Sequence, residues 1–146
     1  MATTTATITL SSADLLSDNM SLSATMNLYQ NGTTATGLDE MNYHRLVIPT
    51  GASFDLIEES TKLSEDASYV YIINKNTDVT DYVKISINTE EIGRLYAGDW
   101  LFMPWDSDLN AAANDSSIEI EAFTHEHIIE FALFHNGETL VTSANS

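Results

Sequence analysis

The chain contains no cysteine, which excludes a disulfide-linked scaffold and any metal site built from thiolates. Basic residues are also scarce, because five Lys and Arg stand against 22 Asp and Glu and leave a formal net charge of -17. Affinity for nucleic acids comes mostly from Lys and Arg that neutralise phosphates, and anionic membrane surfaces attract the same residues. We therefore expect neither a nucleic acid nor a membrane among the partners.

Long apolar runs are missing as well. No stretch approaches the ~18 residues that a membrane-spanning helix needs, and the chain does not open with the charged and apolar segments of a signal peptide. Hydrophobic residues still make up 43% of the 146, which is enough for the core of one domain. The sequence predicts a soluble protein that is synthesised in the cytoplasm without a targeting signal.

What the chain does have is regular alternation of apolar and polar residues. In residues 1–10, Ala6, Ile8 and Leu10 alternate with threonines, and residues 20–29 alternate in the same way. This period of two is the signature of a half-exposed β-strand, which β-branched threonine suits. We expect residues 1–30 to form an extended Thr-rich arm and first strands, with contacts between subunits as one role for them.

The rest of the chain, residues 42–146, repeats strand patterns at spacings of ~8–12 residues and shows no convincing helix. Tyr69–Ile73 is apolar on both faces, as expected for a central strand covered on both sides. The polar Asn74–Asp81 that follows is predicted to be a hairpin connection, and Glu91–Asp106 to be two apolar strands. We predict an all-β fold with a single antiparallel β-sandwich, of either jelly-roll or immunoglobulin-like topology.

The one histidine pair with metal-ligand spacing is His125 and His127, which would share a face of a strand. With Glu130 and Gly137 it looks like part of the cupin signature, in which a carboxylate follows the pair and a glycine comes seven positions later. However, Glu130 stands one residue too close to the pair, which turns it to the opposite strand face, and no second cupin motif is present. We therefore expect no metal and no cofactor, and His125 and His127 are the residues that would hold a metal.

Other candidate chemistry fails on spacing. Asp106–Asn110 begins like a calcium loop, but Ala111 and Ser117 replace the glycine and the glutamate that such a loop requires. An irregular calcium site from Asp99, Asp106 and Asp108 stays as an alternative. No serine lies in a nucleophile elbow, and adjacent acids on a strand point to opposite faces. We expect no enzymatic activity.

Both tryptophans lie in Glu91–Asp106, close to Tyr96 and Phe102. Such aromatic side chains can stack on sugar rings, but they also fill cores and subunit interfaces. We favour a core or interface role and keep a carbohydrate-binding module as an alternative. The predicted interface residues are Thr3, Thr5, Ile8, Trp100, Phe102 and Trp105.

Three segments resemble small all-β virion structural proteins of tailed bacteriophages, of the marine or cyanobacterial phage type. They read YVYIINKNTD from Tyr69, AGDWLFMPW from Ala97 and EFALFH from Glu130. The resemblance implies a capsid decoration (cement) protein on the capsid surface of the virion, with the major capsid protein and copies of itself, as a homotrimer, for partners. A tail, neck or fibre component of the same particle is the alternative.

Overall fold

The structure is a computed structural model, and it describes residues 4–15, 20–29, 38, 40–57, 68–87, 89–105 and 117–135. Ten β-strands account for most of this described part. The described residues contain no helix that is long and apolar enough to cross a membrane.

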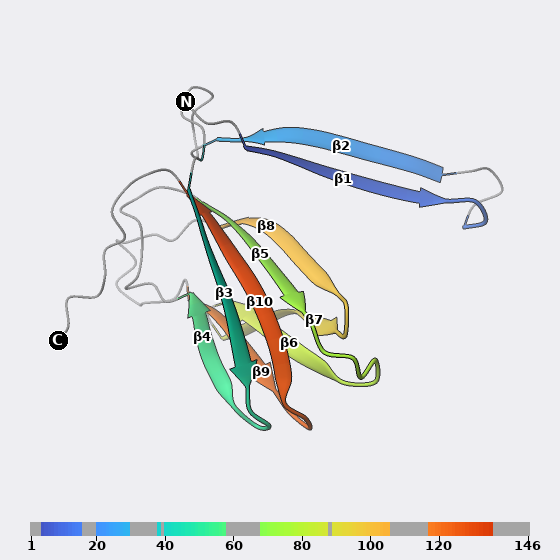
Figure 1. Cartoon of the computed structure of the whole chain (residues 1–146). Coiled ribbons are helices and arrows are strands. Elements are labelled where there is room, and N and C mark those ends of the chain that lie inside the picture. Colours follow the sequence, from blue (N-terminus) through green and yellow to red (C-terminus); the bar gives the residue numbers. More distant parts are fainter. Residues whose placement is uncertain are drawn as a thin grey trace.

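The first two strands form a hairpin that is a sheet of its own. Strand β1 (Thr4–Ser12) pairs antiparallel with β2 (Met20–Leu28), in the register that places Thr4 opposite Leu28 and Ser12 opposite Met20. Figure 1 shows this hairpin projecting beyond the end of the sandwich at which β3 begins and β10 ends. The alternation predicted for residues 1–10 and 20–29 is therefore confirmed as strand structure, with the two strands paired to each other.

The other eight strands form two four-stranded antiparallel sheets that pack face to face (Figure 1). One sheet has the order β3 (Glu40–Ile48), β10 (His127–His135), β5 (Ser68–Asn74) and β8 (Trp100–Trp105). The other has the order β4 (Ser53–Ile57), β9 (Ile118–Ala122), β6 (Tyr82–Ile87) and β7 (Glu90–Tyr96). Consecutive strands cross repeatedly between the sheets in the connectivity of a jelly roll. This confirms the predicted all-β sandwich and selects the jelly roll among its two topologies.

Two of the connections that cross between the sheets fall on segments described in the sequence analysis. Asn74–Asp81 was expected to be a hairpin connection, but it joins β5 to β6 in the opposite sheet. The turn from Ala97 to Asp99 likewise carries the chain from β7 to β8 across the sandwich. Gly98 supplies the positive φ of 86° that this corner needs, and its amide donates to the Asn74 carbonyl at 2.9 Å. The strands themselves were predicted correctly, and the hairpin predicted at Asn74–Asp81 was wrong.

The core lies between the two sheets and consists of the inward side chains of alternating positions. Its fully buried members include Val70 and Ile72 of β5 and Ile118 and Ile120 of β9. Trp105 also belongs to this core at 6% exposure, because it lies on the inward side of β8. Its prediction as an interface residue is therefore corrected, and its alternative assignment to the core holds.

Candidate functional site

The outward side of the sheet β3-β10-β5-β8 carries an unusual concentration of aromatic side chains, and we call it the aromatic face. The register places the outward positions of the four strands side by side, for example Tyr69 next to Phe134 and Tyr71 opposite Phe102. Its aromatic members are Tyr43, Tyr69, Tyr71, Trp100, Phe102 and Phe134. All four neighbouring strands thus present rings on this side rather than the polar residues usual on the open side of a sheet.

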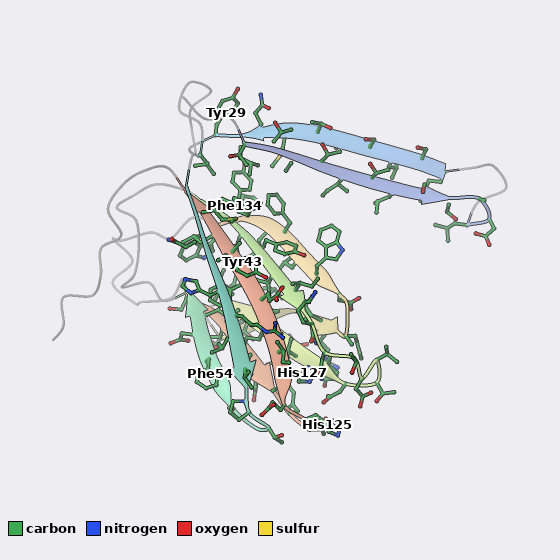
Figure 2. All side chains as sticks on the ribbon, viewed as in Figure 1. Tyr29, Tyr43, Phe54, His125, His127 and Phe134 are labelled. Atoms are coloured by element: carbon green, nitrogen blue, oxygen red, sulfur yellow. The ribbon has the colours of Figure 1, made fainter. Side chains whose placement is uncertain are left out.

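The rings of the aromatic face pack against each other but are not covered. Tyr69 and Phe102 stack with their centroids 5.5 Å apart, and Phe102 meets Phe134 edge-on at 6.3 Å. Tyr43 and Trp100, at the two margins of the face, remain 50% and 52% exposed. Figure 2 shows Phe134 at the end of the sandwich next to the hairpin and Tyr43 on the same sheet. Contiguous apolar surface of this kind marks interaction sites in soluble proteins.

The aromatic face is nearly free of charge. Among its described outward residues the charged pair is Arg45 and Glu130, whose side chains lie 3.7 Å apart. Glu130 also accepts a hydrogen bond from Tyr43, and this bond raises the pKa of the Tyr43 hydroxyl above its ordinary value. The opposite sheet differs, since its outward positions include Asp55, Glu91, Glu119 and Glu121 with Lys84 and Arg94. The acidic residues that the structure describes are therefore concentrated away from the aromatic face.

The hairpin has two chemically different sides. One side carries apolar residues, of which Ile8, Leu10, Leu22 and Met26 are between 41% and 56% exposed. A shallow hollow of about 290 Å³ lies on the hairpin, and Ile8, Leu10, Leu22, Ser23 and Ala24 line it. We call this the apolar side of the hairpin.

The other side of the hairpin is lined by hydroxyl groups. Thr5 bonds Asn27 at 3.2 Å and Thr7 bonds Thr25 at 3.0 Å across the two strands. Neither strand contains an Asp, Glu, Lys or Arg. A two-stranded hairpin is marginally stable alone, so a hairpin with a bare apolar side indicates a surface that another element covers.

The base of the hairpin is held to the segment that leads into the sandwich. The Leu38 amide donates to the Leu28 carbonyl at 3.0 Å, and the Thr4 hydroxyl donates to the Leu38 carbonyl at 2.7 Å. Leu28 and Leu38 are both buried, at 2% and 1% exposure. Because Leu38 lies two residues before β3, these bonds constrain the direction in which the hairpin leaves the sandwich.

A polar site lies at the end of the sandwich opposite to the hairpin, and we call it the Asp81 cluster. It consists of Asn74, Asp81, His125 and His127. Oδ2 of Asp81 is 2.7 Å from Nδ1 of His125 and 3.1 Å from Nε2 of His127. Asp81 and His127 are buried, whereas the His125 side chain is 61% exposed. Figure 2 shows His125 at the tip of the sandwich and His127 nearer to its interior.

The protonation state of Asp81 follows from its partners. Burial would raise the pKa of its carboxyl group, but hydrogen bonds from Thr124, His125, the Tyr82 amide and His127 outweigh burial. The net effect holds the pKa of Asp81 well below its ordinary value. The carboxylate is therefore ionised at neutral pH and joins the loop before β6 to the turn before β10.

Each histidine directs one ring nitrogen at Asp81 as a hydrogen-bond partner. Among the residues that the structure describes, no group of three His, Asp or Glu side chains is arranged to hold a metal ion. Glu130 lies on the outward side of β10, next to Arg45, while His127 points inward. The one-residue mismatch to the cupin signature thus does place Glu130 on the opposite face.

The other predicted residues are spread over both surfaces. Thr5 lies on the hydroxyl side of the hairpin, Ile8 on its apolar side, and Trp100 and Phe102 on the aromatic face. Thr3 lies outside the described residues, as do Asp106 and Asp108 of the alternative calcium site. Trp100 and Trp105 cannot form one sugar platform, because they lie on opposite sides of β8 and Trp105 is buried.

Most of the aromatic face was not predicted as a surface, although the sequence carried a signal for it. Tyr69–Ile73 is apolar at every position, and only one side of β5 faces the core. Its outward residues are half-buried by their neighbours in the sheet, and no other described strand covers them. Within the described part, the prediction of a strand covered on both sides is therefore wrong. A strand that is apolar on both sides, in a two-layer sandwich, therefore signals an interface on its outer side.

Asp81 and Asn74 were missed because they are far in sequence from the histidines.

Comparisons with known proteins give the chain no family. No family model matches the chain, and no curated protein matches it. Among solved structures, a cupin protein from Bacteroides fragilis is similar, at 20% sequence identity, over 70% of this chain and 71% of that chain, with a TM-score of 0.42. A likeness at that level carries no argument about activity or ligands, so the functional conclusion depends on the two surfaces.

Proposed function

We propose that this chain is a structural protein of a tailed-phage virion that binds the outside of the capsid as a decoration protein and stabilises the head. The projecting hairpin is the observation that carries the proposal. Its two strands contain no charged residue, in a chain whose formal net charge is -17, and they leave the sandwich at one end. A jelly roll serves viral capsid proteins, lectins and cupins alike, so the architecture is compatible with this role without selecting it.

The hairpin suits attachment to another protein in a second way. Among the described strands, β1 and β2 pair with each other alone, so each keeps one strand edge with free backbone donors and acceptors. Such an edge can add to a sheet of a neighbouring protein and gain main-chain hydrogen bonds. In the proposal, the major capsid protein supplies that sheet, and the protein has no catalytic role.

The proposal is tested by deleting residues 2–28, which removes both hairpin strands and leaves every strand of the sandwich. We expect the shortened protein to stay folded, with an unchanged β-type circular dichroism spectrum, and to lose co-sedimentation with heads of the phage that encodes it. Full occupancy of the shortened protein on heads would contradict the role of the hairpin.

Immunogold electron microscopy of purified virions locates the protein independently. Label over the head supports decoration. Label on the tail, neck or fibres assigns the chain to the alternative class of virion component, and absence of the chain from virions contradicts both.

A further inference from the structure

We infer that the apolar side of the hairpin of one copy docks on the aromatic face of a second copy, so that copies of this chain interlock. The inference deepens the proposed function, because it names the two surfaces by which the subunits associate. It depends on the hairpin and the sandwich of the isolated protein and does not involve the capsid.

Within the described part of the chain, no strand covers either surface. Leu10 and Leu22 on the hairpin are 52% and 56% exposed, and Trp100 on the aromatic face is 52% exposed. Among the described strands, β1 and β2 pair with each other alone, and Figure 1 shows the hairpin leaving the sandwich at the end where β3 begins. A second copy is therefore the molecule that the hairpin of this chain can reach.

Charge selects the same pairing. A copy with a net charge of -17 repels another copy, so a stable contact needs surfaces from which the acids are absent. The hairpin strands contain no charged residue, and the aromatic face contains the mutually paired Arg45 and Glu130. If two copies associated through the outer side of the other sheet, which carries Glu119 and Glu121, acids of one copy would face acids of the second copy.

The strands that form the two surfaces also agree in length. Each hairpin strand has nine residues, as do β3 and β10 of the aromatic face. The hollow of about 290 Å³ beside Leu10 and Leu22 offers a place for an exposed ring such as Trp100 or Tyr43.

The size of the contact reaches what a specific interface needs. At ~3.3 Å per residue and ~4.8 Å between strands, a hairpin of this length covers roughly 300 Å² of a facing sheet. One docked hairpin therefore removes roughly 600 Å² from water on its two sides, and a reciprocal pair roughly 1,200 Å². The value for a reciprocal pair is the lower end of the range for specific protein complexes, whereas each interface of a larger closed ring would hold one hairpin and bury roughly 600 Å².

Cysteine cross-linking tests the pairing directly, because the chain has no cysteine of its own. A Leu10→Cys protein is mixed with a differently sized Trp100→Cys or Tyr43→Cys protein and oxidised without capsids. We expect a disulfide between the two chains, and none when Thr9→Cys replaces Leu10→Cys, since Thr9 faces the hydroxyl side. Equal cross-linking from Thr9→Cys, or no cross-link from Leu10→Cys, would overturn the inference.

Light scattering over a range of micromolar concentrations supplies the second measurement. We expect the wild type to be oligomeric and Leu22→Asp to weaken association about thirtyfold or more, which corresponds to an interface hot spot. Its neighbour Ser21→Asp, on the hydroxyl side, carries the same added charge and should change association by less than about threefold. Leu22 is exposed, so the sandwich should unfold at the same denaturant concentration in all three proteins. A monomeric wild type that still binds heads would overturn this inference and leave the proposed function standing.

Discussion

The hydrogen bonds of the Asp81 cluster assign the tautomer of its buried histidine. The Asn74 amide nitrogen donates to the Leu95 carbonyl at 2.9 Å, and the Asn76 backbone amide donates to the Asn74 side-chain oxygen at 2.9 Å. These two bonds fix the orientation of the Asn74 amide, so its nitrogen also faces Nδ1 of His127 at 3.2 Å as a donor. Nδ1 must therefore accept, and the proton of neutral His127 lies on Nε2, where it is donated to Asp81.

An Asp81→Asn substitution should destabilise the fold by about 2 kcal/mol at neutral pH, because it places an amide N–H among donors that need a carboxylate. Since the pKa of Asp81 is lower in the folded than in the unfolded protein, its ionised form stabilises the fold above about pH 4. That contribution is lost as the pH falls further. The difference between wild type and Asp81→Asn in urea unfolding should therefore shrink between pH 6 and about pH 3.

A matched control for this experiment is His125→Ala, which removes one bond to the same carboxylate from an exposed ring. We expect it to cost less than about 1 kcal/mol. An Asp81→Asn protein that unfolds at the wild-type urea concentration, or a difference that does not change with pH, would contradict this account of the cluster.

The sequence singled out two residues of this cluster without predicting the cluster itself. The spacing of His125 and His127 is a local signal that marked them as the residues that would hold a metal, and the structure bonds both to Asp81. Their shared partner Asp81 is 44 residues from His125 in the chain and is one of 22 acids, so no local pattern distinguishes it. The strand order brings the two loops together, and it is not visible in the alternation of residues.

At the scale of elements, the turn between β6 and β7 stores backbone strain. Ile87 pairs with Glu90, and Thr89, directly before Glu90 in the chain, has a φ of 62°. A β-branched residue rarely adopts this left-handed conformation, which costs roughly 1–3 kcal/mol outside glycine. The two strands it joins are held by the register of the sheet, which forces the turn.

Replacing Thr89 with glycine should stabilise the protein by about 0.5–1 kcal/mol, because relief of strain exceeds the backbone entropy that glycine adds to the unfolded chain. Thr89→Ala keeps a Cβ at positive φ and should gain less. Denaturant midpoints of the three proteins measure the effect. A lower midpoint for Thr89→Gly than for wild type would show that the turn is not strained.

Strand positions were far easier to predict than the sheets that contain them. The alternation in residues 20–29 anticipated β2, and the apolar run from Tyr69 anticipated β5. An alternation with a period of two shows which side chains share a face of a strand. It does not show whether the next strand joins the same sheet or the other sheet. The corners at Asn74–Asp81 and Ala97–Asp99 cross to the other sheet, and the predicted hairpin at the first of them failed for that reason.

At the scale of the whole molecule, the chain separates its charge from its apolar surface. The hairpin and the aromatic face are close to neutral, while Asp55, Glu119 and Glu121 occupy the outer side of the other sheet. The net charge of -17 then opposes the approach of two copies over a long range without entering the proposed contact. Assembly is in this way set by two opposed terms, apolar burial and screened repulsion.

These two terms predict how association of the isolated protein depends on salt. Raising NaCl from about 0.1 M to about 1 M shortens the Debye length from ~10 Å to ~3 Å, so repulsion between the acidic sides should fall while apolar contact persists. We expect association to tighten by roughly tenfold, which light scattering or analytical ultracentrifugation measures. An interface made of ion pairs would weaken under the same change. An Asp55→Asn, Glu119→Gln double variant, altered far from the contact, should associate more tightly than wild type at low salt and respond less to added NaCl. If its salt response equals that of wild type, the charge of this outer side does not govern assembly.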